Sequence, residues 1–300
     1  MKDFFLYDSI AKIKIILKGA VFMSLTFIDV LKVIFLGIVE GITEWLPVSS
    51  TGHMLLVDEF IKLNITPEFK EMFFVVIQLG AILAVVLIFW NKMFPFQFSD
   101  KRKPIIKYDI FSMWFKVVVA CIPGAVVTLL FDDFIDAHLH TAVVIALMLI
   151  IYGVAFIVVE NRNHHRRPKI RKLNEITYQT AFIIGLFQVL SIIPGTSRSG
   201  STIIGALIIG VSRVAAAEFT FFLAVPVMFG LSFIKLIKFG FAFTGAEVAT
   251  LAIGTITAFV VSLFAVKFLM GYVKKHDFKI FGIYRIILGI IVLIYFGIFA

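Results

Sequence analysis

The sequence has few charged residues and almost no cysteine. Only 16% of its 300 residues are Asp, Glu, Lys or Arg, whereas soluble domains carry roughly 25%. The one cysteine, Cys121, cannot form an internal disulfide and excludes a cysteine-based zinc site. With 61% hydrophobic residues and a mean hydropathy of +1.04, the composition excludes a soluble globular protein, a disordered chain and a coiled coil. The class that remains is an integral α-helical membrane protein.

The net charge of +9 does not indicate a nucleic-acid partner. The Lys and Arg residues stand in short runs between apolar segments, where membrane proteins keep their cytoplasmic loops. We therefore expect the partner of this chain to be a lipid bilayer and not a nucleic acid.

Six apolar runs are long enough to cross a bilayer as helices, which takes about 20 residues. They cover residues 71–91, 113–132, 141–160, 215–236, 247–270 and 281–299. The basic segments 92–107, 161–173 and 271–280 belong in the cytoplasm by the positive-inside rule. Residues 132–140 hold three aspartates and no Lys or Arg, which predicts a loop on the outside.

Two further apolar regions, 28–64 and 178–212, are each broken in the middle by a proline and a polar cluster. Proline ends a helix, and a Ser or Thr just afterwards caps a new one. The orientation of the neighbouring spans predicts re-entrant pairs, the first entering from outside and the second from inside. Non-helical backbone at membrane depth is tolerated where it is buried in protein or lines a wet cavity, so the breaks predict a site.

The two breaks also indicate an internal repeat. Pro47 and Pro194 are 147 residues apart. At the same spacing Ser49 matches Thr196 and Ser50 matches Ser197, and a one-residue slip upstream matches Glu40 with Gln188. The predicted fold is an all-α polytopic membrane protein with six transmembrane helices plus two re-entrant helix pairs in an inverted-topology repeat. Residues 23–160 form the first repeat, 161–177 a basic cytoplasmic loop and 178–300 the second repeat.

Residues 1–22 form an N-terminal extension with four lysines, which fits poorly with an N-terminus on the outside. Two interpretations stay open. Either Met23 is the true start, or residues 9–22 form an amphipathic helix on the membrane surface.

Ionisable side chains inside a membrane are costly and mark functional sites. Glu40 and Glu44 share one helix face, His53 follows the first break, and Arg198 lies in the second. Each break begins a helix, whose free N–H groups and positive dipole end favour an anion. Arg198 adds a guanidinium fork suited to phosphate. We therefore expect an oxyanion ligand, with phosphate or diphosphate as the first candidate.

Two glutamates beside a phosphate require a cation or protons between them. Mg²⁺ typically bridges one or two carboxylates and substrate phosphates. Alternatively, one glutamate orients His53 as a general base or donates a proton. Simpler interpretations also stay open: a proton or sodium relay through the glutamates, a structural His53, or an ion pair between Arg198 and Glu40 or Glu44. Ser49, Ser201 and Thr202 are best explained as helix caps.

The run Glu40-Gly-Ile-Thr-Glu44-Trp-Leu-Pro-Val-Ser-Ser-Thr-Gly-His53 and the run Pro194-Gly-Thr-Ser-Arg-Ser-Gly-Ser-Thr202 resemble the two signatures of the undecaprenyl-diphosphatase family of bacitracin-resistance membrane phosphatases. The resemblance extends from about residue 23 to the end. It implies hydrolysis of undecaprenyl diphosphate to the monophosphate, which recycles the carrier lipid for peptidoglycan synthesis. It also implies a site in the bacterial cytoplasmic (inner) membrane that opens toward the outer face.

By motif position, the resemblance assigns catalytic roles to five residues: Glu40, Glu44, Ser50, His53 and Arg198. Glu40 and Glu44 would also bind Mg²⁺ or Ca²⁺. The residues expected around the substrate are Ser49, Thr51, Gly52, Gln188, Gly195, Thr196, Ser197, Ser199 and Thr202. Ser50 is the favoured nucleophile because His53 is three residues further on, with Ser197 and water as alternatives.

A transporter or flippase for the same polyprenyl phosphate is the alternative of a different class, because inverted repeats are typical of transporters. A transporter would move the lipid and release no phosphate. The sequence leaves the oligomeric state open, a homodimer included.

Overall fold

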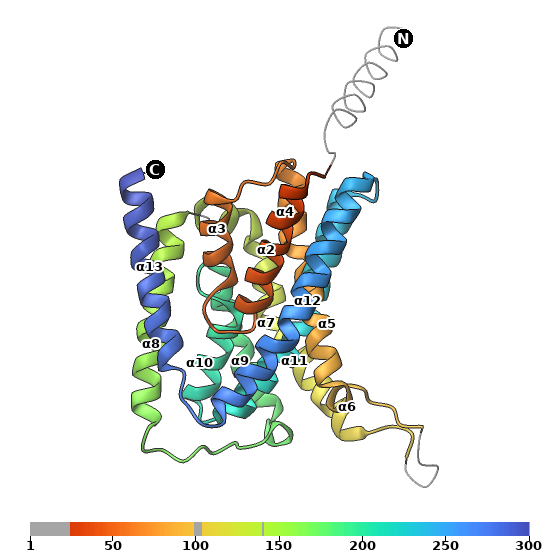
Figure 1. Ribbon diagram of the computed structural model, residues 1–300. Coiled ribbons are helices and arrows are strands. Elements are labelled where there is room, and N and C mark those ends of the chain that lie inside the picture. The colour runs from red at the N-terminus through yellow and green to blue at the C-terminus, as the bar shows by residue number, and fades with distance from the viewer. Residues whose placement is uncertain (1–24, 99–103, 140, 300) are drawn as a thin grey trace.

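The computed structural model describes residues 25–98, 104–139 and 141–299, and Figure 1 shows them as a bundle of roughly parallel and antiparallel helices. The predicted N-terminal extension lies outside the described residues. The helices are α2 (Phe27–Thr43), α3 (Ser50–Phe60), α4 (Pro67–Val76), α5 (Gln78–Ile88), α6 (Trp90–Met93), α7 (Tyr108–Leu139), α8 (Ala142–Asn163), α9 (Tyr178–Val189), α10 (Arg198–Ile208), α11 (Arg213–Phe239), α12 (Gly245–Val273) and α13 (Lys279–Phe299). Two short 3₁₀ turns cover Leu173–Glu175 and Leu190–Ile192.

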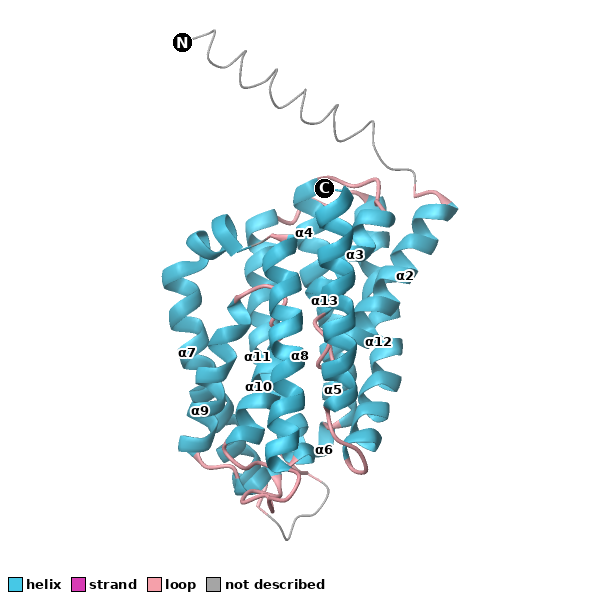
Figure 2. Ribbon diagram, turned by 90° about the vertical axis from the view of Figure 1, so that its left-hand side faces the viewer, coloured by secondary structure: helices cyan, strands magenta, loops and turns pink. Residues whose placement is uncertain are grey.

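The six predicted membrane spans are confirmed, with ends that differ by a few residues. Six helices among the described residues are long and apolar enough to cross a bilayer: Pro67–Ile88, Tyr108–Phe131, Ala142–Asn163, Arg213–Phe239, Gly245–Val273 and Lys279–Ile298. Figure 2 shows them running side by side along the long axis of the bundle. The chain is therefore a multi-pass α-helical membrane protein.

The loop predicted at 132–140 is wrong. The backbone of α7 continues as a helix through Leu139, over 32 residues. A helix of that length spans about 48 Å, well beyond the roughly 30 Å of the hydrocarbon core. Aspartates end the apolar run without breaking the helix, so hydropathy marks the edge of the membrane segment and not the end of the helix.

The helix starts follow from local capping. Ser or Thr side chains accept a backbone N–H of the first turn at the N-caps Thr26, Ser49, Thr66, Thr141, Thr177, Ser197, Ser212 and Thr244. At Thr244 the cap is reciprocal, because Glu247 also accepts the Thr244 N–H. Such caps satisfy donors that the first helical turn leaves open.

The two broken segments form two helix pairs of similar design. The first pair is α2 and α3, and the second is α9 and α10. The helix after each break has 11 residues. The serines that cap these helices, Ser49 and Ser197, have positive φ angles of 72° and 71°, and they are the only non-glycine residues with positive φ in the described parts of the chain. Figure 1 shows the first break in the middle of the bundle.

These matching caps shift the repeat register predicted around the prolines. Ser49 and Ser197 are equivalent positions, because each is the N-cap of the helix after its break. Ser50 therefore corresponds to Arg198 and not to Ser197. The slipped register of Glu40 and Gln188 therefore extends through the caps. The segments from Glu40 to Ser49 and from Gln188 to Ser197 are equally long, so only the proline differs: it stands two residues before the cap in the first break and three residues before it in the second.

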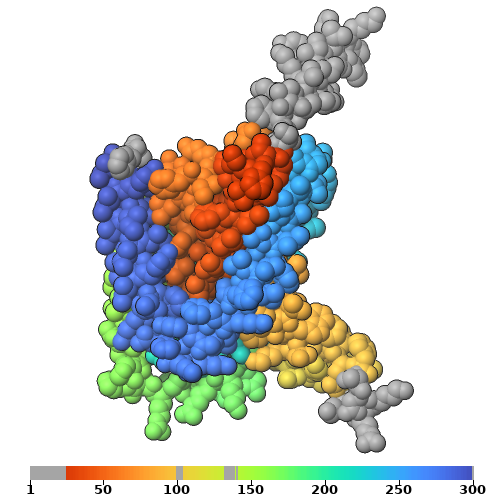
Figure 3. Space-filling view, in the orientation of Figure 1, coloured from red at the N-terminus to blue at the C-terminus, as the bar shows by residue number. Residues whose placement is uncertain are grey.

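Helices of the first half of the chain pack against helices of the second half, and the contacts are reciprocal between the halves. Helix α12 packs against α2, and α7 packs against α9. Helix α8 packs against α13, and α11 packs against α4 and α5. Figure 3 shows one face of the molecule, where the N-terminal helices in red and orange lie between α12 and α13, both in blue. The re-entrant course and the inverted repeat stay predictions with which this packing is compatible.

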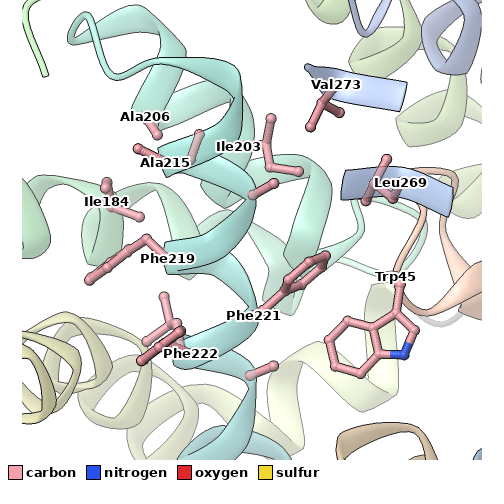
Figure 4. Packing of buried hydrophobic residues seen from close by; sticks show 14 of the residues in the cluster. Trp45, Ile184, Ile203, Ala206, Ala215, Phe219, Phe221, Phe222, Leu269 and Val273 are labelled. Atoms are coloured by element: carbon pink, nitrogen blue, oxygen red, sulfur yellow. The ribbon is translucent and has the colours of Figure 1, made fainter. Parts of the chain in front are cut away.

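A buried apolar core surrounds the first break. Trp45 is fully buried, and its ring meets that of Phe221 edge-to-face with centroids 5.1 Å apart. Figure 4 shows Trp45 facing Phe221 and Leu269, with Phe219, Phe222 and Ile184 further along the same cluster. Aromatic pairs in this geometry add to the free energy of burial. The core thus fixes the turn that follows Glu44.

Candidate functional site

The first turns of α3 and α10 present similar backbone donors. Ser49 Oγ accepts from Gly52 N at 3.3 Å, and Ser197 Oγ accepts from Gly200 N at 3.2 Å. Both serines therefore act as helix caps, as expected for Ser49. The other first-turn N–H groups have no carbonyl partner within their own helix, which leaves them available to an anion.

Arg198 and Glu44 connect the two breaks. The Arg198 guanidinium donates to Glu44 Oε1 at 3.0 Å and to the Thr220 carbonyl at 3.1 Å. Ser50 Oγ donates to the other carboxylate oxygen of Glu44 at 2.8 Å. The Arg198 and Glu44 side chains are only 11% and 8% exposed, so this ion pair is shielded from bulk solvent. The ion pair left open by the sequence is present, with Glu44 as the partner.

Glu40 lies one helical turn before Glu44 at the end of α2 and is 1% exposed. Its carboxyl is close enough to that of Glu44 for the two to interact electrostatically. The Oε1 atom of Glu40 is buried and has no hydrogen-bond partner. A buried acceptor without a partner is costly and calls for a proton or a cation.

These two carboxyl groups fit a divalent cation that is completed by its substrate. Among the described residues, no group of three or more His, Cys, Asp or Glu side chains could hold a metal by itself. Mg²⁺ is usually held by one or two carboxylates together with substrate phosphates, and the free Glu40 oxygen is of the type that would serve as one such ligand. Glu44 is already bonded to Ser50 and Arg198, which makes Glu40 the more available ligand.

His53 is not hydrogen-bonded to Ser50, although the sequence spacing suggested that it could reach it. Its Nδ1 lies 2.7 Å from the Ser49 carbonyl oxygen, and its Nε2 lies 2.7 Å from the hydroxyl of Tyr284. Ser50 instead donates to Glu44. In this arrangement Glu44, rather than His53, is the group directly bonded to the favoured nucleophile.

The remaining predicted residues divide into polar groups near Arg198 and groups that shape the backbone. Ser199 Oγ lies 3.1 Å from Ser197 Oγ and 3.5 Å from the Glu44 carbonyl. Thr202 is fully buried and bonds to Thr220 and to α10 carbonyls, which makes it part of the helix packing. Thr51 is exposed at the start of α3.

Three predicted residues lie deeper around the second break. Gln188 is 5% exposed and its Oε1 has no partner, as at the matching Glu40. Thr196 is fully buried with an unpaired Oγ1. Gly195 has a φ of +88°, and a Cβ there would lie 2.5 Å from the Ile145 carbonyl oxygen. Gly52 is similarly close-packed, with a Cβ position 3.1 Å from Leu149.

Arg285 is a residue of the site that the sequence motifs did not predict. It is fully buried in α13, and its guanidinium donates to the carbonyls of Pro47 at 3.2 Å, Gly195 at 2.8 Å and Thr196 at 3.0 Å. It therefore joins the first break to the second. The available signal was a lone arginine inside the apolar run 281–299, since intramembrane charges mark functional positions.

The charges of the site are distributed unequally between the two halves. In the structural register, Glu40 corresponds to Gln188, Ser50 to Arg198, and His53 to Ser201. The first break thus provides the carboxylates and the imidazole, and the second provides the guanidinium. One composite site is built from two similar backbones with different side chains.

A multi-pass helical membrane protein with a buried, charged site between two broken helix pairs is the class that the fold defines. Comparison with known proteins identifies the family. The family model described as Bacitracin resistance protein BacA matches residues 33–291. The chain belongs to this family.

Close relatives carry a consistent name. A protein from Enterococcus faecalis named undecaprenyl-diphosphatase is 72% identical over 91% of this chain and 99% of its own length. Proteins of the same name from Desulfitobacterium hafniense and Lachnoclostridium phytofermentans are 61% and 62% identical, over 91% and 90% of this chain and 98% of each relative.

Proposed function

We propose that this protein is an integral-membrane phosphatase that hydrolyses undecaprenyl diphosphate to undecaprenyl phosphate and inorganic phosphate. The observation that carries the proposal is the Arg198–Glu44–Ser50 chain of hydrogen bonds, which sets a cation, a carboxylate and a hydroxyl between two helix N-termini. The names of its close relatives support the same activity.

Each group has a definite task in this reaction. The N-termini of α3 and α10 and the Arg198 guanidinium bind the diphosphate oxygens and stabilise the charge that develops in the transition state. Glu44 orients Arg198 and Ser50 through its two carboxylate oxygens. Attack on the terminal phosphorus breaks its bond to the bridging oxygen, which leaves with the lipid monophosphate.

Ser50 is our preferred nucleophile, with Ser197 or water as alternatives. When Ser50 attacks, Oγ passes its proton to Glu44, with which it is already hydrogen-bonded, and the phosphoryl group is transferred to Ser50. Water then hydrolyses this phosphoserine and releases inorganic phosphate. A Mg²⁺ or Ca²⁺ ion held by Glu40 and Glu44 would supply charge neutralisation and Lewis-acid activation of phosphate oxygens. His53 acts as a second base next to the hydrogen-bonded groups Arg198, Glu44 and Ser50.

The membrane setting follows from charge and from the chemistry of the substrate. The loops after α8 and α12, and the segment around α6, lie at the same end of the bundle (Figure 1). These segments carry the basic runs, so this end faces the cytoplasm. We place the protein in the bacterial cytoplasmic membrane, with the site open toward the outer face. There it would return the carrier lipid to peptidoglycan synthesis and confer bacitracin resistance.

The test is phosphate release from undecaprenyl diphosphate by the purified protein in detergent, with Mg²⁺, with Ca²⁺ and with EDTA. We expect release by the wild type, its collapse in Arg198→Ala, and its loss in EDTA. A folded wild type that releases no phosphate with any divalent cation would overturn the proposal. Activity that persists in EDTA would overturn only the role of the metal.

The transporter alternative receives no support from the reported relatives, all of which are named undecaprenyl-diphosphatase. The transporter function would be favoured only if a folded protein moved the lipid without releasing phosphate.

A further inference from the structure

Tyr284 is placed against His53 more closely than packing alone requires. Its hydroxyl oxygen lies 2.7 Å from His53 Nε2, which is a short hydrogen bond. The two rings are within 4° of parallel, with centroids 5.5 Å apart. Tyr284 is 231 residues away from His53 in the sequence, and neither signature contains it.

The two hydrogen bonds of His53 together define its tautomer. The Ser49 carbonyl can only accept, so Nδ1 must carry a proton in order to bond to it at 2.7 Å. In the neutral ring Nε2 then has the lone pair, and Tyr284 must be the donor. The tyrosine hydroxyl thus occupies the one basic atom that a neutral His53 has available.

The backbone around His53 is held as firmly as its ring. Ser49, whose carbonyl receives the Nδ1 proton, is in the left-handed region at φ 72°. Arg285 follows Tyr284 in α13 and is anchored on carbonyls of both breaks. One helix therefore positions the hydroxyl relative to the site, and the neighbouring residue fixes the helix.

Helices α13, α8 and α2 contribute the groups around the first turn of α3, which carries His53. Helix α13 contributes Tyr284 and the positive charge of Arg285. Helix α8 packs against α3 and brings the apolar side chains of Ile145 and Leu149 to Gly52. From the α2 side, Glu44 is bonded to Ser50, three residues before His53, and to Arg198.

We propose that Tyr284 is a positioning residue that fixes the Nδ1–H tautomer and the ring plane of His53 and holds Nε2 until the substrate is bound. The proposal rests on the proposed phosphatase function. It assigns no contact with the reacting phosphate to Tyr284. In the second half Ser201 occupies in α10 the position that His53 occupies in α3, so that position has a hydroxyl and no imidazole to orient.

The test is Tyr284→Phe, which removes the hydroxyl and keeps the ring that packs on His53. The loss of one hydrogen bond is worth about 1 kcal/mol, so we expect kcat to fall about 3- to 10-fold while KM changes less than 2-fold. A tyrosine hydroxyl that donates to Nε2 stabilises only the neutral ring. The acid limb of the pH profile should therefore move to higher pH in the variant.

Tyr178→Phe is the matched control, because Tyr178 begins α9 and its ring contacts Lys116, outside the network of His53. It should keep the wild-type kcat and pH profile. In a His53→Ala background, Tyr284→Phe should have no further effect, because its action passes through the imidazole.

Three results would overturn the inference: an unchanged kcat and pH profile in Tyr284→Phe, a rise in KM alone, or full multiplication of the two losses in the double variant. Each assumes an active wild type. A wild type that releases no phosphate would instead overturn the proposed function, so the two failures are distinguishable.

Discussion

Glu44 and Arg198 are 154 residues apart in the sequence, and their side chains meet at 3.0 Å between the two breaks. Each comes from a different half of the chain, and each has a second partner, Ser50 for the carboxylate and the Thr220 carbonyl for the guanidinium. A buried pair of this kind fixes the relative position of the helix ends to which it is attached.

Replacing Arg198 should abolish most of the activity. Arg198→Lys keeps the charge but has no fork that reaches both Glu44 and the Thr220 carbonyl. We expect phosphate release to fall by about 10²- to 10³-fold in both Arg198→Lys and Arg198→Ala, the loss typical of a removed transition-state donor. Arg162→Ala, at the exposed end of α8, is the control and should retain activity. A fully active Arg198→Lys would show that charge alone is sufficient.

Glu40→Gln should change the requirement for the divalent cation. The substitution keeps the shape of the side chain and removes the charge from a buried carboxyl with a free oxygen. We expect the Mg²⁺ concentration for half-maximal activity to rise by at least about tenfold, as for weakened metal ligation elsewhere. The measurement is a Mg²⁺ titration of phosphate release. Glu71→Gln, whose carboxylate is exposed and paired with Lys235, should leave the titration unchanged.

Arg285 should be a determinant of stability as well as of activity. Arg285→Met leaves three carbonyls without their donor, and each buried group left unpaired costs about 1–3 kcal/mol. Arg285→Lys can satisfy some of them, so the unfolding midpoints should rank wild type above Lys above Met.

Lys279→Met is the matched control in the same helix. Its partly exposed pair with Asp277 contributes little, and its unfolding midpoint in detergent should equal that of the wild type. Equal midpoints for Arg285→Met and the wild type would contradict the role assigned to Arg285.

Gly195→Ala should destabilise the second break. The φ of +88° costs a residue with a Cβ about 1–3 kcal/mol, and the Cβ would lie 2.5 Å from the Ile145 carbonyl oxygen. We expect a lower unfolding midpoint together with lost phosphate release. Gly230→Ala in α11 meets nothing within 4 Å and should be neutral or slightly stabilising. A wild-type midpoint for Gly195→Ala would mean that the break relaxes at no cost.

The sequence by itself determined the membrane class, the six spans and the two breaks. These depend on local properties: transfer of about 20 apolar residues into lipid, the inability of proline to continue a helix, and capping by nearby Ser and Thr. The chemistry of the site residues was likewise readable, because Glu40, Glu44, His53 and Arg198 are costly in apolar segments unless they have a use.

Only the tertiary structure decided which of these groups meet. The spacing in the sequence predicted a contact between His53 and Ser50. In the structure Ser50 is hydrogen-bonded to Glu44, and His53 is hydrogen-bonded to Tyr284. The anchoring of both breaks by Arg285 depends equally on long-range packing. Hydropathy describes the transfer of each segment into lipid. A hydrogen bond, in contrast, depends on direction and distance between segments that the sequence does not align.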